Sequence, residues 1–208
     1  MNKPYILGIC GGSASGKTFL LSQLLQQFSP ETVTLISQDN YYHPLEKQTR
    51  TPDGLVNFDH PDSLDLDRFV GDMNKLIKGE TVTLQEYTFN NPNRTPQMIS
   101  YRSAPIIIVE GLFIFHKEEM ARLIDLKIFV DAAEHIRLAR RLRRDTTERG
   151  YSTESILRDY EKFVAPMYQK FVAPARDQSD MVVMNNQHMY KAIRVIINHL
   201  QTILKSHA

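Results

Sequence analysis

The sequence lacks several features that would assign it to a specialised class of protein. It has one cysteine, Cys10, in 208 residues, so no internal disulfide can form and a reducing compartment such as the cytoplasm is expected. No apolar run approaches the roughly 20 residues of a membrane-spanning helix, and the N-terminal apolar stretch is too short for a signal peptide. Lysine and arginine number 25 against 24 aspartates and glutamates, which predicts no general binding to nucleic acid or membranes.

What the sequence does contain is the composition of an ordinary globular protein. Hydrophobic residues make up 42% of the chain and charged residues 24%. The length is sufficient for one α/β core with at most a small insertion. No linker or low-complexity tract divides the chain, so we expect a single domain over residues 1–208.

Short apolar runs alternate with segments of helical periodicity. Five runs are typical of buried parallel strands, at residues 5–10, 32–37, 106–109, 126–130 and 181–184. Helical patterns fall at about 17–28, 65–78, 133–149, 152–166 and 188–205, with Ser152 or Thr153 as the cap of the fourth. The alternation predicts an α/β protein with a parallel sheet covered on both faces.

Residues 40–103 depart from this rhythm. The segment is rich in proline, asparagine, aspartate and aromatic residues, and it contains one helical pattern and a predicted β-hairpin around residues 81–101. We expect it to form an insertion on the substrate side, beside the mouth of the sheet.

A glycine-rich segment follows the first predicted strand. It reads GGSASGKT and fits the G-x-x-x-x-G-K-[ST] pattern of a phosphate-binding P-loop. In such a loop backbone N–H groups face phosphate oxygens, the lysine reaches the terminal phosphates and the threonine hydroxyl ligates Mg²⁺. A plain strand-to-helix turn is the alternative, but the strand–loop–helix context favours nucleotide binding. The residues expected to contact a nucleoside triphosphate are Gly11, Gly12, Ser13, Ala14, Ser15, Gly16, Lys17 and Thr18.

Two carboxylates follow predicted strands, at the edge of the sheet where ligands bind in this class of fold. Asp39 comes after the second strand and Glu110 after the third. A P-loop kinase needs one carboxylate to orient or deprotonate the attacking hydroxyl and another to hold the metal shell. We assign Asp39 to the first task and Glu110, with Thr18, to Mg²⁺. Helix capping or plain surface exposure is the alternative for either carboxylate.

The segment EHIRLARRLRRDTTERGY is rich in arginine. On a helix four arginines share one face: Arg137, Arg140, Arg141 and Arg144. Three apolar side chains lie on a different side and are expected to pack inward: Ile136, Ala139 and Leu142. Guanidinium groups stabilise the charge that spreads over a transferring phosphoryl group. We therefore predict a lid over about 137–151 that closes on the triphosphate; a solvated basic face or an RNA-binding patch is the alternative.

A further carboxylate, Asp59, lies within NFDHPDSLD. A carboxylate can accept hydrogen bonds from two neighbouring hydroxyls, as on a ribose. Aromatic residues in the same insertion could enclose a flat base by stacking, or form a small core of their own: Tyr41, Tyr42, Phe58, Tyr87 and Phe89.

Together these segments resemble the uridine-cytidine kinases. GGSASGKT, SQDNYY, NFDHPDSLD, VEGLF, RRLRRDTTERG and VAPMYQKFVAPARDQSD occur in the order and spacing of that family, and the resemblance runs from about residue 5 to 204. It implies a P-loop kinase fold, a three-layer sandwich with a five-stranded parallel sheet. It also implies Mg²⁺-dependent transfer of a γ-phosphate, from ATP or GTP, to the 5′-hydroxyl of a pyrimidine nucleoside, by a homotetramer.

The resemblance also implies roles for individual residues. Asp39 matches the catalytic base of the family, and Asp59 matches the carboxylate that grips the ribose hydroxyls. Arg141 matches a substrate-side arginine, and two lid arginines on the phosphates match Arg144 and Arg149. Four aromatic residues match positions around the sugar and base: Tyr42, Phe58, Tyr87 and Phe89.

Three positions depart from the family's pattern, all where the base is read. Pro92 stands in place of a hydrogen-bonding side chain, Tyr151 in place of an arginine and Asp159 in place of a glutamine. The phosphate-handling motifs are intact. We therefore expect a nucleoside kinase that discriminates weakly between uridine and cytidine. Two alternatives stay open: another small hydroxyl acceptor, as in the phosphoribulokinase and pantothenate kinase branches, or a nucleotide-binding regulator.

Overall fold

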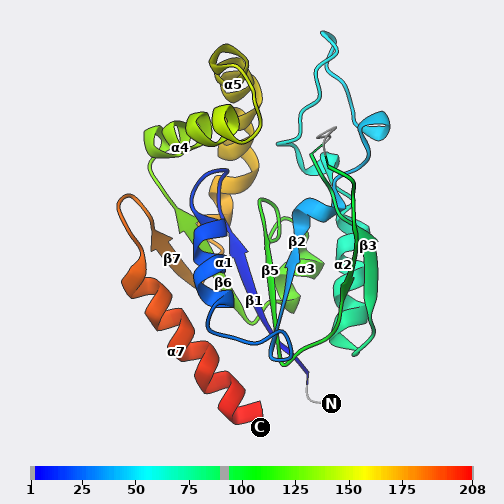
Figure 1. Ribbon diagram of the computed structural model, residues 1–208, viewed down its shortest axis with the longest axis vertical. Coiled ribbons are helices and arrows are strands. Elements are labelled where there is room, and N and C mark those ends of the chain that lie inside the picture. Colours follow the sequence, from blue (N-terminus) through cyan, green and yellow to red (C-terminus); the bar gives the residue numbers. More distant parts are fainter. Residues whose placement is uncertain (1–2, 90–93, 208) are drawn as a thin grey trace.

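A parallel sheet forms the centre of the computed structural model, which describes residues 3–89 and 94–207 (Figure 1). The strand order is β2-β5-β1-β6-β7, and all neighbours run parallel. The strands are β1 (Tyr5–Cys10), β2 (Val33–Ser37), β5 (Ile106–Gly111), β6 (Leu126–Asp131) and β7 (Met181–Met184). Each begins within one residue of its predicted run, so the parallel α/β sheet is confirmed.

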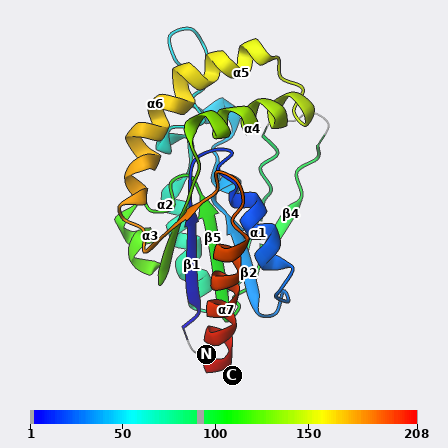
Figure 2. The ribbon, with the colours of Figure 1, turned by 90° about the vertical axis from the view of Figure 1, so that its left-hand side faces the viewer.

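Helices cover both faces of the sheet (Figures 1 and 2). One face packs against α1 (Lys17–Leu25) and α7 (Tyr190–His207), and the other against α2 (Leu66–Ile77) and α3 (Glu118–Leu123). Alternate side chains of a strand point to opposite faces, so Leu7 joins the α1–α7 core and its neighbour Ile6 the α2–α3 core. Cys10 is also in the second core, and burial raises the pKa of its thiol to about 12, as suits a packing residue.

The chain between β2 and β5 forms the insertion, which lies along one side of the sheet (Figure 1). Besides α2 it contains three 3₁₀ turns, η1 (Gln38–Tyr41), η2 (Leu45–Lys47) and η3 (Pro61–Ser63). The predicted hairpin is present as an antiparallel pair, β3 (Val82–Gln85) and β4 (Met98–Tyr101). Val82 and Leu84 point inward from β3 and join the core that α2 closes.

A long helical arm follows α4 (Glu134–Thr147). It runs through α5 (Thr153–Asp159), η4 (Tyr160–Val164), α6 (Ala165–Met167), η5 (Tyr168–Val172) and η6 (Ala173–Arg176). The Ser152 side chain caps α5 by accepting the N–H of Ser155 at 3.2 Å. The predicted end near Pro166 is wrong, because the arm continues for a further ten residues.

The arm passes its prolines by widening into π-helical turns. It contains a repeated segment, YEKFVAP followed by YQKFVAP, and η4 and η5 are the π turns of the two copies. Proline has no N–H for the carbonyl four residues back, and its ring crowds that carbonyl. The preceding alanines donate instead to the carbonyls five residues back, Ala165 to Tyr160 and Ala173 to Tyr168. The helix therefore bends around each proline without ending.

The face of α4 that points inward is the opposite of the predicted one. Its two buried residues are charged, Arg137 and Asp145, whereas Ala139 is exposed and Ile136 and Leu142 are only partly buried. The physical reason is that the inward charges have partners, which offset the cost of removing them from water: Arg137 bonds to Ala132, Arg140 to Asn185, and Arg141 and Arg144 to Asp145. None of the helices in the described ranges has the length and apolarity needed to cross a membrane.

Candidate active site

The P-loop, residues 11–18, joins β1 to α1 through backbone conformations that favour glycine. Gly11 has a φ of 155° and Gly16 a φ of 108°. A Cβ atom at Gly11 would lie 2.4 Å from the carbonyl oxygen of Val130, and one at Gly16 would lie 2.1 Å from Nδ2 of Asn185. These two glycines are therefore required by the packing of the loop against β6 and the residue after β7.

Lys17 folds over the P-loop. Its Nζ donates to the carbonyl oxygen of Gly11 at 2.8 Å and to that of Gly12 at 3.3 Å. These bonds hold the ammonium group at the loop, where the terminal phosphates bind in P-loop proteins. The neighbouring Thr18 is exposed at the start of α1.

Two polar side chains, those of Asn185 and Arg140, support the P-loop through hydrogen bonds. Nδ2 of the buried Asn185 donates to the carbonyl oxygen of Ser15 at 2.8 Å, and Nη2 of Arg140 donates to the carbonyl oxygen of Asn185 at 2.9 Å. Sequence reasoning did not identify Asn185. The signal that could have found it is its position directly after β7, where the chain leaves the carboxyl edge of the sheet beside the loop.

Asp39 and Glu110 meet at the carboxyl ends of β2 and β5. Ser37 pairs with Glu110 in the register of these strands, and its hydroxyl donates to Oε1 of Glu110 at 2.5 Å. The same hydroxyl accepts the N–H of Asp39 at 3.3 Å. Burial raises the pKa of Asp39 to about 7, with a further contribution from the charge of Glu110, whereas Lys17 and two lid arginines oppose the rise. A carboxyl group that titrates near neutrality suits a general base.

Thr18 and Glu110 supply oxygen atoms to the same cavity. Mg²⁺ prefers oxygen ligands and usually retains several waters and phosphate oxygens, so one or two protein groups suffice. Across residues 3–89 and 94–207 no cluster of three His, Cys, Asp or Glu side chains forms an all-protein metal site. The residues present therefore fit an ion that is shared with a bound nucleotide.

Four aromatic side chains of the insertion form one cluster. The ring centroid of Tyr42 lies 5.9 Å from that of Phe58, 5.1 Å from that of Tyr87 and 6.0 Å from that of Phe89. The Tyr42 hydroxyl donates to the carbonyl oxygen of Phe58 at 3.0 Å, which fixes the ring. Tyr41, by contrast, is a core residue that contacts Phe69.

Asp59 follows Phe58 and is linked electrostatically to the lid. Burial raises the pKa of its carboxyl group, and the positive charges of Arg141 and Arg144 lower it. Asp59 lines the same cavity as these two arginines.

Three of the predicted arginines converge on Asp145, which sequence reasoning did not identify. Its carboxylate pairs with Nε of Arg141 at 3.3 Å, Nε of Arg144 at 2.8 Å and Nη1 of Arg149 at 3.4 Å. In a sequence, a single acidic residue among arginines is typical of an exposed ion pair on a helix surface. The burial of Asp145 could therefore not be predicted. Arg137 lies apart from this group: it donates to the carbonyl oxygen of Ala132 at 3.1 Å.

One cavity of about 1110 Å³ brings the predicted site residues together. Gly11, Gly12 and Ser15 are buried beneath it within the P-loop. Those that line it are Ser13, Ala14, Gly16, Lys17, Thr18, Asp39, Tyr42, Phe58, Asp59, Tyr87, Phe89, Glu110, Arg141, Arg144 and Arg149.

Two of the three departures from the resemblance also line the cavity. Tyr151 and Asp159 both border it, and Asp159 pairs with Nη2 of Arg158 at 2.9 Å. Pro92 lies outside the described residues. Of these two, Tyr151 lies in the turn between α4 and α5, and Asp159 lies at the end of α5.

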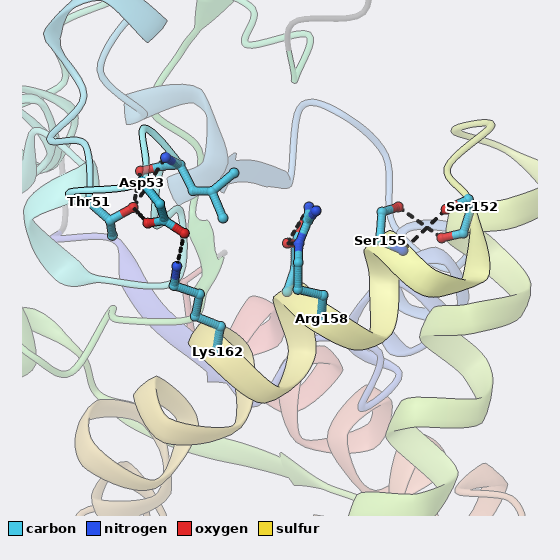
Figure 3. Close-up of polar contacts among 8 residues, drawn as sticks. Thr51, Asp53, Ser152, Ser155, Arg158 and Lys162 are labelled. Atoms are coloured by element: carbon cyan, nitrogen blue, oxygen red, sulfur yellow. Dashed lines mark hydrogen bonds and ion pairs between the residues drawn. The ribbon is translucent and has the colours of Figure 1, made fainter.

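The insertion and the arm also contact each other through an ion pair (Figure 3). A tight turn is held by Thr51, whose hydroxyl donates to Oδ1 of Asp53 at 2.6 Å, and Asp53 pairs in turn with Lys162 of η4. Leu55, in the same turn, lines the cavity, as does Phe163 beside the lysine. The ion pair thus joins two walls of the cavity.

The model of the Phosphoribulokinase / Uridine kinase family matches residues 6–189. The chain belongs to this family. Both proteins in the family's name are kinases, and this chain carries an intact P-loop motif. The family match covers the P-loop, both carboxylates, the insertion and the whole helical arm.

Curated relatives of this chain are named for uridine. It is 33% identical over 204 residues to "Uridine kinase" of Brevibacillus brevis, covering 98% of this chain and 95% of that protein. It is 34% identical over 208 residues to "Uridine kinase-like protein 3" of Arabidopsis thaliana, covering 99% of this chain. The chain spans less than half the length of that plant protein, 44%.

Solved structures share the fold of this chain. Phosphoribulokinase from Rhodobacter spheroides matches with a TM-score of 0.63 at 20% identity, covering 88% of this chain and 71% of that one. A possible uridine kinase from Bacillus stearothermophilus matches with a TM-score of 0.59 at 16% identity, covering 88% and 89%. These likenesses confirm the predicted P-loop kinase fold.

Proposed function

We propose that this kinase transfers the γ-phosphate of ATP to the 5′-hydroxyl of a pyrimidine ribonucleoside, uridine or cytidine, and so serves pyrimidine salvage. One observation supports this most strongly: the P-loop, Asp39, Asp59 and the aromatic cluster line the same cavity. A phosphate donor, a base for a hydroxyl, a carboxylate for vicinal hydroxyls and stacking surfaces for a ring are the parts that this reaction needs. The names of the curated relatives support the same acceptor.

In this proposal the P-loop and Lys17 bind the donor. Backbone N–H groups of residues 11–18 and the positive end of α1 face the phosphates. Lys17 leaves its carbonyl partners in the loop and binds the terminal phosphates. When bound with the nucleotide, Mg²⁺ neutralises phosphate charge, and Thr18 and Glu110 are the groups that would hold it.

Asp39 is the proposed general base. In its ionised form it accepts the proton of the acceptor hydroxyl while that oxygen attacks the γ-phosphorus. The bond between the β–γ bridging oxygen and phosphorus breaks, and ADP leaves. Arg144 and Arg149 stabilise the charge that spreads over the transferring group, since guanidinium donors form a planar fork that suits phosphoryl oxygens.

Asp59 and the aromatic cluster are proposed to hold the nucleoside. The Asp59 carboxylate accepts hydrogen bonds from the 2′- and 3′-hydroxyls. Tyr42, Phe58, Tyr87 and Phe89 supply flat surfaces against which a pyrimidine stacks, while Arg141 faces the substrate from the lid. Stacking tolerates many rings, so base selectivity depends on polar groups at the base edge.

A different acceptor within the family is the second candidate. It is favoured by Tyr151 and Asp159, which border the cavity where the resemblance expects arginine and glutamine. Such an acceptor would retain vicinal hydroxyls, because Asp59 is in place. A homotetramer and a cytoplasmic location stay predictions from the resemblance and from the cysteine content.

The product of the reaction tests the proposal. Purified protein is incubated with MgATP and uridine, and the product is identified by phosphorus–proton coupling in its NMR spectrum. We expect uridine 5′-monophosphate with one ADP per product. Phosphate on the 2′- or 3′-oxygen, or ADP release that is unchanged by uridine and cytidine, would overturn it.

A further inference from the structure

Asp145 is the buried acid at the centre of the lid. It is 2% exposed, and its carboxylate pairs with Arg144 at 2.8 Å, Arg141 at 3.3 Å and Arg149 at 3.4 Å. Arg141 and Arg149 stand four residues before and after Asp145, and Arg144 is its neighbour in the chain. The negative charge of Asp145 therefore holds together three positive side chains that would otherwise repel one another.

The backbone of Asp145 also fixes the end of the lid. Its carbonyl oxygen accepts the N–H of Tyr151 at 3.1 Å, which folds the chain back after α4. This bond places Arg149, in the intervening turn, within reach of the carboxylate. Both the side chain and the main chain of Asp145 thus set the geometry of the turn.

The arginines paired with Asp145 make further contacts on opposite sides of the site. Nη1 of Arg141 donates to the Ser13 hydroxyl of the P-loop at 3.1 Å. The guanidinium carbon of Arg149 lies 5.0 Å from the ring centroid of Phe89, in the aromatic cluster. Asp145 is therefore the shared anchor of contacts that reach both the phosphate side and the acceptor side.

Arg144 and Arg149 keep N–H donors available for a phosphate while they are paired with Asp145. Arg144 gives its Nε to the carboxylate, so both of its terminal nitrogens can point away, and Arg149 gives one terminal nitrogen. A guanidinium has five N–H donors, so it can serve a carboxylate and a phosphoryl oxygen together. Asp145 can thus orient the arginines without displacing a nucleotide.

We propose that Asp145 is a positioning residue for phosphoryl transfer, which holds Arg144 and Arg149 in the orientation that the transferring group requires and keeps Arg141 against the P-loop. It acts through the arginines and does not touch the substrate. The inference rests on the proposed role of Arg144 and Arg149 at the phosphates. A site held in place before binding loses less freedom when the nucleotide arrives, and small displacements of catalytic groups lower the rate strongly.

The test is the substitution Asp145→Asn, which keeps the shape and removes the charge. We expect kcat to fall by about 10- to 100-fold, the scale of misplaced catalytic groups, while the Kd for ADP changes by less than about threefold. ADP lacks the transferring phosphoryl group, so its affinity reports the P-loop rather than the lid. Asp145→Ser is measured in parallel, because its smaller side chain leaves room for water in the buried site.

Asp72→Asn is the matched control. Asp72 is 4% exposed and pairs with Lys75 at 2.8 Å and Arg68 at 3.7 Å, on α2. Loss of this buried carboxylate is expected to lower the melting temperature and to leave kcat unchanged. A kcat for Asp145→Asn within about threefold of the wild type, with only the melting temperature lowered, would show that Asp145 is structural and overturn the proposal.

A double-mutant cycle tests whether Asp145 acts through Arg144. In the Arg144→Ala background, Asp145→Asn is expected to lower kcat by a smaller factor than it does alone, because one of its partners is already absent. The same factor in both backgrounds would overturn the proposal. Slow hydrolysis of ATP without acceptor is measured alongside. If nucleosides are not turned over but Asp145→Asn still lowers this hydrolysis, the proposed acceptor fails and the role of Asp145 stands.

Discussion

Asp39 illustrates how position in the fold sets the chemistry of one residue. It lies just beyond β2, half-buried and beside Glu110, and both its burial and this neighbour raise its pKa, to about 7. The amino-acid type alone would leave the carboxyl group fully ionised at neutral pH and a weak base. Its surroundings therefore convert an ordinary aspartate into a candidate proton acceptor.

Replacement of this carboxylate tests its role. Asp39→Asn is expected to lower kcat by about 10²-fold or more, the usual effect of losing a general base, and to leave ADP affinity nearly unchanged. Asp62→Asn, an exposed acid in the same insertion, serves as the control. Near-normal turnover by Asp39→Asn would remove this residue from the mechanism.

The pH dependence follows from the raised pKa. The ionised carboxyl group is the active form, so activity is lost as pH falls and Asp39 becomes protonated. A plot of log kcat/KM for ATP, which reports the free enzyme, is expected to bend near pH 7 and to decline below it. A profile that stays flat down to pH 5 would show that Asp39 does not titrate in this range or is not needed.

Arg144 is expected to act mainly on the transition state. Arg144→Ala should lower kcat by about 10²- to 10³-fold, as for other groups that face developing charge, and should weaken ATP binding less. Arg144→Lys should restore activity only in part, because lysine lacks the planar pair of donors. Arg194→Ala, an exposed arginine on α7, is the control. Equal losses in ATP affinity and kcat would indicate uniform binding instead.

At the scale of an element, the turn of the insertion around Asp53 connects the insertion to the arm beside the cavity. It is tied to η4 of the arm by the ion pair between Asp53 and Lys162 (Figure 3). The bond from Lys162 and a second from the Thr51 hydroxyl lower the pKa of Asp53 to about 2, so this carboxyl group is ionised throughout the physiological range.

Removal of this ion pair should weaken binding of the nucleoside and leave binding of the phosphates of ATP unchanged. Lys162→Ala is expected to raise the KM for the nucleoside by about two- to fivefold, the scale of an exposed ion pair, with kcat and the KM for ATP unchanged. The repeat in the arm offers a matched control, Lys170→Ala, at the equivalent position of the second copy. Equal effects of the two substitutions would show that the ion pair has no role of its own.

At the scale of the whole molecule, buried strands were the most predictable part. Each strand of the sheet is a short apolar run, and the P-loop spacing predicts a strand–loop–helix unit. The positions of Asp39 and Glu110 at the carboxyl edge of the sheet could therefore be predicted from the sequence. The arm was less predictable, because prolines usually end helices and here they are absorbed by π-helical turns. The inward face of α4 was predicted wrongly, because its arginines pair with the buried Asp145 of the same helix and with Ser13 and Asn185 of other segments. The short helix α3 was not predicted at all.

The acceptor is the central claim, and initial rates with a panel of acceptors test it most directly. ADP release is measured with uridine, cytidine, their 2′-deoxy forms, ribulose 5-phosphate and pantothenate, each at saturating MgATP. We predict turnover of uridine and cytidine within about tenfold of each other, because stacking surfaces read bases weakly, and much poorer turnover of the deoxy forms, because Asp59 loses a hydroxyl partner. Turnover of another acceptor with none of either ribonucleoside would contradict the account.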